Sequence, residues 1–403
     1  MSGSSAGGDS PGGPEAARAR LARGLRDSGR TPSPSVQAAF ASVPRHLFLP
    51  ELTLAAAYAD DALVIKYDPD GLPVSSSSQP AMMAIMLEQL GLEAGHRVLE
   101  IGTGSGYNAA VLAHIVGPGG RVVTIDIDPG LVARAMASLG AAGYPFVEAR
   151  CADGGFGDPG GAPFDRIIVT AGAWDIAPAW LDQLDRGGRL VLPLSVRGIQ
   201  LSVALQRRQD HWAAGSAFRC GFVRMAGAFA DPEPFRPLGS ARYAQDGGGP
   251  PVDAGELAAA LAAGPAAEAG TAVGAAGLDE LSDLDLWLTF TQPELGRLTV
   301  ISTAPGGPLP FGGLTRGQLA GDLGVAALAS AAGEIVVRGY GPDGPALAAF
   351  LAGLAPAWTE QRRPGTASLR LTAWPAGTPP RGVDGQLVLR RPHIQLAAGW
   401  PAA

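Results

Sequence analysis

The run from Val98 to Tyr107 combines a carboxylate with a glycine loop, which is chemistry suited to binding a nucleotide. An apolar stretch ends in Glu100, and Gly102, Gly104 and Gly106 follow in a G-x-G-x-G pattern before an alanine-rich stretch typical of a helix. Dinucleotide folds use G-x-G-x-x-G, so that a helix N-terminus receives a pyrophosphate. Because Glu100 would repel a pyrophosphate, the pattern predicts a ligand with cationic groups and no phosphate. S-Adenosylmethionine, with its sulfonium and α-amino group, fits this description.

Acids further along the chain support this prediction. Asp126 ends a β-branched run about 20 residues past the loop, where Rossmann-like folds place the acid that binds the ribose hydroxyls. Asp128 is a second candidate, or alternatively the cap of a helix that begins near Pro129. Asp153 stands where such folds usually meet the adenine amino group. The candidate cofactor-binding residues are Glu100, Gly102, Thr103, Gly104, Ser105, Gly106, Asp126, Asp153 and Gly154.

Strand and helix patterns alternate around these residues and indicate how they are positioned. The buried-strand pattern of Phe164–Thr170 and the later strand pattern of Arg189–Leu194 extend the alternation that begins at Val98. Strands that alternate with helices favour an open, mostly parallel sheet. We therefore expect an α/β fold: a Rossmann-like core of the class I S-adenosylmethionine-dependent methyltransferase type, with a smaller C-terminal α+β domain.

Composition excludes several kinds of partner. The net charge of −7 shows no excess of basic residues with which to bind nucleic acid, so we expect no nucleic-acid partner. We also expect no membrane partner and no metal, because no stretch is apolar enough to span a bilayer and the two cysteines and five histidines lack metal-ligand spacing. The first residues lack the apolar segment of a signal peptide, and we expect a cytoplasmic protein.

The 403 residues are enough for two or three domains. We expect residues 1–13 to be disordered and residues 14–228 to form the cofactor-binding domain. Residues 229–277, rich in Gly, Ala and Pro, are expected to form a linker, and residues 278–403 a C-terminal α+β domain. In that last domain we expect a strand at Leu286–Phe290 and a helix at Thr315–Leu323.

An ordered series of motifs between residues 16 and 228 resembles the protein-L-isoaspartate O-methyltransferase family. Besides the glycine loop, the series contains Val43–Pro50, which is similar to the family's V-P-R-H-x-F signature, and the later segments Ala57–Asp60, Ser78–Pro80 and Ile167–Ala171. The resemblance implies methyl transfer from S-adenosylmethionine to a carboxylate of a peptide substrate.

One segment departs from the family pattern. The family typically has G-Q-T-I-S-Q-P where this chain has V-S-S-S-S-Q-P at Val74–Pro80, so that Ser78, Gln79 and Pro80 are kept. In the family this segment forms the acceptor-side wall. Together with the C-terminal domain, the departure resembles a branch that methylates an aspartate of a cyclised, ribosomally made peptide (a graspetide or lanthipeptide), after which the ester closes to an aspartimide.

A carboxylate acceptor is already ionised at neutral pH, so methyl transfer needs alignment rather than a strong base. We expect the Ser78 hydroxyl to orient this carboxylate. Thr170 either positions substrate or caps the next turn. Gln79, Ser76 and Ser77 are further substrate candidates, although Ser75–Ser77 could also be a flexible polar loop.

Three functions remain open at this point. The first, which the two departures favour, is tailoring of a cyclised precursor peptide. The second is repair of isoaspartyl peptides, which uses the same cofactor and forms the same bond. The third, from another class, is a cofactor-binding protein without catalysis.

Overall fold

The computed structural model describes residues 12–232, 235–247, 251–274, 277–302, 311–316, 323–381 and 387–400. The chain divides into two compact units. The N-terminal unit comprises Met1–Leu194, Ser202–Gly215 and Cys220–Ala230, and the C-terminal unit comprises Ser195–Leu201, Ser216–Arg219 and Asp231–Ala403. Residues 1–11 of the expected disordered segment lie outside the described residues, whereas Gly13 already begins the first helix.

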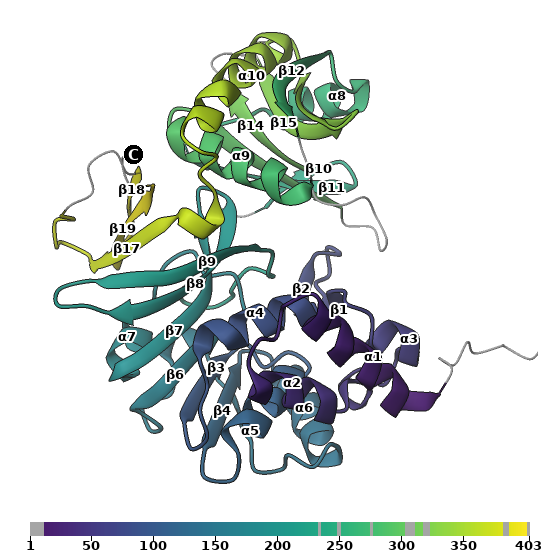
Figure 1. Ribbon diagram of the computed structural model, residues 1–403, viewed down its shortest axis with the longest axis vertical. Helices are drawn as coiled ribbons and strands as arrows, with labels where there is room; N and C mark the ends of the chain where they lie inside the picture. The colour runs from purple at the N-terminus through teal and green to yellow at the C-terminus, as the bar shows by residue number, and fades with distance from the viewer. Residues whose placement is uncertain are drawn as a thin grey trace, which may run out of the picture. The chain divides into compact units, whose positions relative to one another are not determined.

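A parallel sheet forms the centre of the N-terminal unit (Figure 1). Its strands run in the order β7-β6-β3-β4-β5, and each neighbouring pair is parallel. The strands are β3 (Arg97–Ile101), β4 (Arg121–Asp126), β5 (Glu148–Cys151), β6 (Phe164–Val169) and β7 (Leu184–Val196), and β8 (Ile199–Arg207) and β9 (Trp212–Cys220) follow beyond β7. This arrangement confirms the expected α/β fold of the class I methyltransferase type.

Helices connect the parallel strands, as parallel pairing requires. Helix α5 (Tyr107–Val116) connects β3 to β4, α6 (Pro129–Ala141) connects β4 to β5, and α7 (Pro178–Gln183) lies between β6 and β7, while α4 (Pro80–Leu90) precedes β3. The strands of the sheet interior are almost continuous apolar runs: in β3, Val98 to Ile101 are all buried. A sheet covered on both faces has this pattern.

An N-terminal layer packs against the helices of this core. It contains α1 (Gly13–Asp27), α2 (Pro34–Ser42), the 3-10 helix η1 (Arg45–Phe48) and α3 (Leu54–Ala57), followed by an antiparallel hairpin of β1 (Leu63–Tyr67) and β2 (Pro73–Ser77). Phe40 of α2 and Phe48 of η1 both make edge-on contacts with the ring of Tyr107, at the start of α5. This aromatic cluster packs α2 and η1 against α5, the helix that follows the glycine loop.

The C-terminal unit contains a seven-stranded antiparallel sheet in the order β10-β11-β13-β14-β15-β16-β12. Its strands are β10 (Arg236–Leu238), β11 (Ala241–Gly247), β12 (Ala267–Gly274), β13 (Gly296–Ser302), β14 (Phe311–Arg316), β15 (Gly324–Ala331) and β16 (Glu334–Tyr340). The helices are α8 (Ala254–Ala263), α9 (Leu278–Thr291) and α10 (Gly344–Glu360). In addition, β19 (Ile394–Gly399) pairs with both β17 (Arg370–Pro375) and β18 (Leu387–Arg390).

The structure corrects the linker that we expected at residues 229–277. Three strands and α8 lie in this segment, and from Asp231 onward it belongs to the C-terminal unit. Tyr243 and Leu257 are buried in one apolar cluster with Leu298 and Val325. The prediction was wrong because a few well-spaced large side chains anchor a segment whose composition is otherwise that of a flexible connection.

Two local expectations in the C-terminal unit also differ from the structure. Leu286–Phe290 belongs to helix α9, because a short apolar run cannot by itself distinguish a strand from a buried helix. Thr315 and Arg316, expected to begin a helix, end strand β14. Residues 317–322 of that expected helix lie outside the described residues.

Candidate active site

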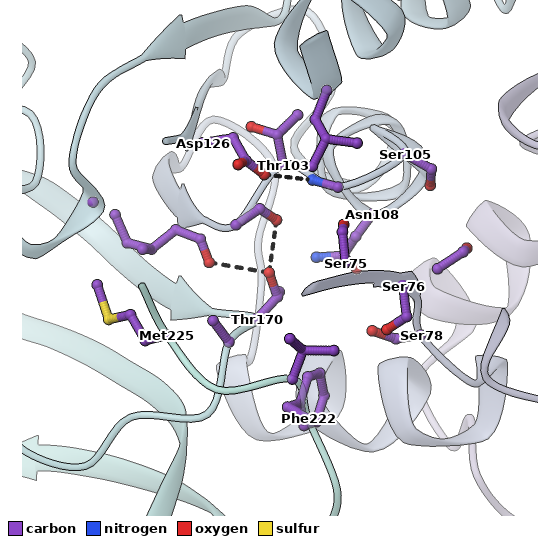
Figure 2. A pocket seen from close by; sticks show the side chains of 18 of the residues that line it. Ser75, Ser76, Ser78, Thr103, Ser105, Asn108, Asp126, Thr170, Phe222 and Met225 are labelled. Atoms are coloured by element: carbon purple, nitrogen blue, oxygen red, sulfur yellow. Dashed lines mark hydrogen bonds between the residues drawn. The ribbon is translucent and has the colours of Figure 1, made fainter. Parts of the chain in front are cut away.

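A pocket opens at the carboxyl ends of β3, β4 and β6, the edge where open α/β sheets place their sites (Figure 2). The segments that follow these strands supply one part of its wall, and other parts come from β2 with Ser78, from Met83 and Met86 of α4, and from Phe222–Ala226. Figure 2 shows Ser75, Ser76 and Ser78 on one side of the pocket and Asp126 with Thr103 on another. The polar residues that line the pocket include Ser75, Ser76, Ser77, Ser78, Thr103, Ser105, Tyr107, Asn108, Asp126 and Thr170.

Backbone geometry explains the glycines of the loop. Gly102, Gly104 and Gly106 all have positive φ angles, of 103°, 52° and 85°, which side-chain-bearing residues rarely adopt. Gly102 also lies so close to Thr170 that a Cβ atom there would meet Thr170 Oγ1 at 2.5 Å. The loop therefore turns tightly at the end of β3, and Gly102, Thr103, Gly104 and Ser105 line the pocket, while Gly106 does not and packs against Ala135 of α6.

The Asp126 carboxylate ends β4 and lines the pocket. Its Oδ2 accepts a hydrogen bond from Gly104 N at 3.0 Å, and its Oδ1 accepts one from Asp128 N at 3.1 Å. These amides fix the carboxylate at the glycine loop and leave oxygen lone pairs for a ligand. Ribose hydroxyls are donors of the kind that this arrangement suits.

Asp128 has the second of its two predicted roles. Its Oδ1 accepts hydrogen bonds from Gly130 N and Leu131 N and so caps α6. Its Oδ2 pairs with Lys66 of the hairpin, and this contact is the main cause that lowers the Asp128 pKa. Asp128 is thus a capping residue and does not line the pocket.

Glu100 does not line the pocket, which corrects its expected role as a direct ligand. The side chain is fully buried behind the loop, where Oε1 accepts from Asn108 Nδ2 at 2.7 Å and Oε2 accepts from Thr124 Oγ1 at 2.6 Å. Burial raises the pKa of this carboxyl to about 7. Asn108, which the sequence reasoning missed, does line the pocket, so Glu100 acts by holding the Asn108 amide there.

Asp153 likewise does not line the pocket, although the next residue, Gly154, does. Its carboxylate accepts from Gly155 N at 2.9 Å, where it caps the 3-10 helix η2 (Gly154–Phe156), and from Ala228 N at 2.7 Å. These two hydrogen bonds give Asp153 a structural role that the sequence reasoning missed, and its contact with the adenine amino group stays a prediction. Asp153 ties η2 to the segment that follows the pocket wall Phe222–Ala226.

Ser75–Ser77 belong to β2, the last strand of the hairpin, and do not form a flexible loop; together with Ser78, which follows β2, they form one wall of the pocket. Ser75 and Ser77 are buried, whereas Ser76 and Ser78 are half-buried. Gln79 differs from its expected role as a substrate residue: it does not line the pocket, and its amide donates to Asp60 O at 3.0 Å. It anchors the start of α4 instead.

Thr170 lines the pocket, but its hydroxyl proton is used inside the protein. Its Oγ1 lies 3.0 Å from Ile101 O and 2.7 Å from Gly102 O, so it donates to backbone carbonyls at the glycine loop (Figure 2). This hydroxyl therefore anchors the glycine loop, a structural role that differs from capping the turn after Thr170, and its part in positioning substrate stays a prediction.

Arg45, in the segment similar to V-P-R-H-x-F, is a residue whose role sequence reasoning missed. Its guanidinium is fully buried; Nε donates to Ala57 O at 2.9 Å and Nη2 donates to Ser78 O at 3.0 Å. It also lies 4.8 Å from the ring centre of Tyr107, and burial lowers its pKa. Arg45 therefore fixes the backbone at Ser78 from behind the pocket wall.

The described residues contain no group of three or more His, Cys, Asp or Glu side chains placed to hold a metal. Nor does any helix of the described part of the chain have the length and apolarity needed to cross a membrane. The polar groups of the pocket are mainly hydroxyls and backbone amides, together with the side chains of Asp126, Asn108 and Arg224. Such groups bind and orient ligands, which is what an SN2 methyl transfer to a carboxylate requires.

Comparison with known proteins agrees with this geometry. The family model described as protein-L-isoaspartate(D-aspartate) O-methyltransferase matches residues 16–228. A protein-L-isoaspartate O-methyltransferase of Methanopyrus kandleri is 40% identical over 225 residues, which cover 54% of this chain and 95% of the relative. Protein-L-isoaspartate O-methyltransferase 2 of Archaeoglobus fulgidus is 46% identical over 177 residues, covering 44% of this chain and 78% of the relative.

A solved structure titled protein-L-isoaspartate O-methyltransferase shares the fold with a TM-score of 0.50 at 24% identity. The likeness covers 88% of this chain and 96% of that one, so it extends well beyond the region of the family match. The family match itself spans more than half of the chain. The chain therefore belongs to the protein-L-isoaspartate O-methyltransferase family and is an S-adenosylmethionine-dependent carboxyl methyltransferase.

Proposed function

We propose that this protein methylates the free carboxylate of isoaspartyl residues in peptides and proteins, the first step of their repair. The observation that carries the proposal is the pocket itself. It brings the glycine loop and Asp126 together with Ser78, so that one cavity has a wall for the cofactor and a wall for a carboxylate acceptor.

In this proposal, Asp126 accepts hydrogen bonds from the ribose hydroxyls of S-adenosylmethionine. The loop residues Gly102–Ser105 lie against the cofactor, and Asn108 presents its amide to the same part of the pocket. Glu100 supports this end of the site through Asn108 rather than by direct contact. Bound S-adenosylmethionine supplies an activated methyl group on its sulfonium, and the protein orients the acceptor toward it.

The Ser78 hydroxyl is proposed to hold the acceptor carboxylate. An ordinary carboxylic acid has a pKa near 4 and is ionised at neutral pH, so no general base is needed. A neutral hydroxyl orients the anion while reducing its nucleophilicity less than a cation would. Arg45 supports this role, because its hydrogen bond to Ser78 O fixes the backbone from which the hydroxyl extends.

The comparisons favour repair over the tailoring of a cyclised precursor peptide. The relatives that match are named protein-L-isoaspartate O-methyltransferases. The added C-terminal unit no longer argues for tailoring, since the solved structure with that same title is similar in fold over 88% of this chain. What still favours tailoring is the changed segment Val74–Ser77.

For the C-terminal unit we propose a part in recognising the peptide substrate. Within its described residues there is no cluster of metal-ligand side chains. The buried carboxylate of Asp285 is occupied by Arg219 and Arg297, which leaves it a structural role. We place the protein in the cytoplasm as part of the same proposal, in keeping with its two free cysteines.

The test compares acceptors on the full-length protein. One acceptor is a linear isoaspartyl peptide of arbitrary sequence, and the other is a cyclised peptide encoded beside the gene, if a precursor gene lies there. Repair predicts efficient methyl-ester formation on the linear peptide. Esterification of the cyclised peptide alone would indicate that the protein tailors a precursor peptide. Cofactor binding without methylation of any acceptor would indicate a binding protein.

A further inference from the structure

Lys66, the only lysine of the chain, forms an ion pair that links the β1–β2 hairpin to the start of helix α6. It lies on β1, and its ammonium group donates to Asp128 Oδ2. Asp128 N in turn donates to Asp126 Oδ1, so the ion pair ends beside the acid proposed for the ribose. Neither Lys66 nor Asp128 lines the pocket, so an effect of the pair on the reaction must pass through the elements that it links.

The two strands of the hairpin form a sheet of their own, separate from the parallel sheet. A two-stranded hairpin is only marginally stable by itself, so contacts of side chains must hold it in place. Where β2 ends, Arg45 donates to the carbonyl of Ser78 and holds the base of the hairpin. Near the turn at the other end, Lys66 supplies the contact with Asp128.

The pairing of the two strands shows that Lys66 and the serine wall (Ser75–Ser78) move together. Lys66 pairs with Ser75 across the hairpin, and the register shifts on both sides of this pair. Bulges redirect side chains and are frequent beside active sites. Here the lysine side chain leaves the hairpin to reach Asp128, while its partner Ser75 lines the pocket.

The serine wall lies directly against the glycine loop. A Cβ atom at Gly104 would meet Ser76 O at 3.4 Å and Ser75 Oγ at 3.7 Å, which is close packing between β2 and the loop. Gly104 N also donates to Asp126 Oδ2. The position of β2 therefore determines how closely a cofactor bound at the loop and at Asp126 is enclosed.

The ion pair is exposed enough to open. The side chain of Lys66 is 43% exposed and that of Asp128 is 24% exposed. The lysine is the main reason why the pKa of the Asp128 carboxyl lies below its ordinary value, so the attraction stabilises the closed arrangement. Exposed ion pairs contribute only modestly to stability, and such a contact can form and break during each turnover.

We propose that the Lys66–Asp128 ion pair holds the β1–β2 hairpin against the glycine loop and slows the release of the cofactor, which makes Lys66 a positioning residue for the serine wall. This inference rests on the proposed placement of S-adenosylmethionine at the loop and at Asp126. Methyl transfer converts the cofactor to S-adenosylhomocysteine, which must leave the same pocket after each turnover. The hairpin has to move away from the loop for this to happen.

The test uses Lys66→Gln and Asp128→Asn, each of which removes the attraction between the two charges. Asparagine caps helices as well as aspartate does, so the start of α6 is kept. Lys66→Arg preserves the charge and should restore the behaviour of the wild type. Arg134→Gln is the matched control, because Arg134 of α6 forms an exposed ion pair with Glu51, between η1 and α3, and neither of these residues lines the pocket.

The first measurement is the dissociation rate of S-adenosylhomocysteine from the full-length protein. The rate should rise about two- to fivefold in Lys66→Gln and in Asp128→Asn, the effect of one exposed ion pair, and the double variant should add nothing further. Salt should speed dissociation from the wild type more than from these variants, because it screens the pair. Lys66→Arg and Arg134→Gln should both retain the rate of the wild type.

The second measurement is hydrogen exchange with S-adenosylhomocysteine bound, which separates the inference from the placement of the cofactor. Peptides from the glycine loop should be protected in every variant, whereas residues 74–77 should exchange faster in Lys66→Gln than in the wild type. A protected loop with unchanged dissociation rates in Lys66→Gln and Asp128→Asn overturns the inference, and so does an equal rise in Arg134→Gln. A glycine loop that stays unprotected instead overturns the proposed placement of the cofactor.

Discussion

Replacing Glu100 with glutamine should remove a pH dependence of stability from the N-terminal unit. The Glu100 carboxyl is 0% exposed and is held by Asn108 and Thr124. A glutamine fits the same hydrogen bonds, because Thr124 Oγ1 lies 2.8 Å from Thr103 Oγ1 and its hydroxyl proton can turn toward that atom. The substitution therefore changes the ionisation of the site with little change in packing.

The magnitude follows from the pKa of Glu100, which burial raises from 4.5 to about 7. Between these two values the unfolded chain has lost the proton while the folded protein keeps it, so stability falls as pH rises. The stabilisation is complete below the unfolded pKa and is lost as pH rises through 7. A carboxyl whose pKa is 4.5 in the unfolded chain and about 7 in the folded protein changes the unfolding free energy by about 3 kcal/mol.

Urea denaturation at pH 5 and at pH 8 measures this effect. Hydrogen exchange of peptides from β3 and β4 provides the readout, so that unfolding of the N-terminal unit is followed separately from that of the C-terminal unit. The wild type should lose between 2 and 3 kcal/mol more than Glu100→Gln between the two pH values, roughly the expected linkage. An identical pH dependence in both proteins would refute the argument that Glu100 is buried with a raised pKa.

Three further predictions concern the pocket. Asp126→Asn should weaken S-adenosylmethionine binding roughly tenfold or more in calorimetry, as loss of a charge-assisted hydrogen bond does, and an unchanged affinity would remove the basis for the ribose contact. Asp153→Ala should speed hydrogen exchange at the Ala228 amide, which loses its carboxylate partner; equal exchange rates would count against the tie between η2 and this segment. Ser78→Ala should lower kcat/KM for the acceptor while leaving cofactor affinity nearly intact, whereas a fully active variant would show that another group orients the carboxylate.

A site residue could be predicted from the sequence where the end of its strand places it at the pocket, and could not where the direction of its side chain decides its contacts. Asp126 ends a strand whose apolar run is plain in the sequence, and parallel strands bring their carboxyl ends to one edge, so its place at the pocket follows from the pattern. Glu100 and Asp153 also have carboxylates near the ends of strands β3 and β5, so the sequence predicted them as ligands on the same grounds as Asp126. Their carboxylates turn to partners inside the protein, and the spacing of residues contains no information on which way a side chain turns.

The misplaced elements have a similar origin. Leu286–Phe290 is short and apolar, and its helical character comes from continuity with α9 and from packing of Leu284 and Leu288 in a tertiary core. Residues 229–277 owe their order to contacts with strands distant in sequence, such as the pairing of β11 with β13. Arg45 was overlooked for the same reason, because the acceptors of its three hydrogen bonds lie at residues 57, 78 and 83.

The most direct test of the central claim uses two synthetic peptides that differ only in whether one residue is linked as isoaspartate or as aspartate. Each is incubated with the full-length protein and S-adenosylmethionine that carries a deuterated methyl group, and the products are analysed by mass spectrometry before and after mild base. The account predicts that the isoaspartyl peptide gains one deuterated methyl group as a base-labile ester, while the aspartyl peptide remains unmodified. No transfer to the isoaspartyl peptide, equal transfer to both peptides, or a methyl group that survives base would contradict it.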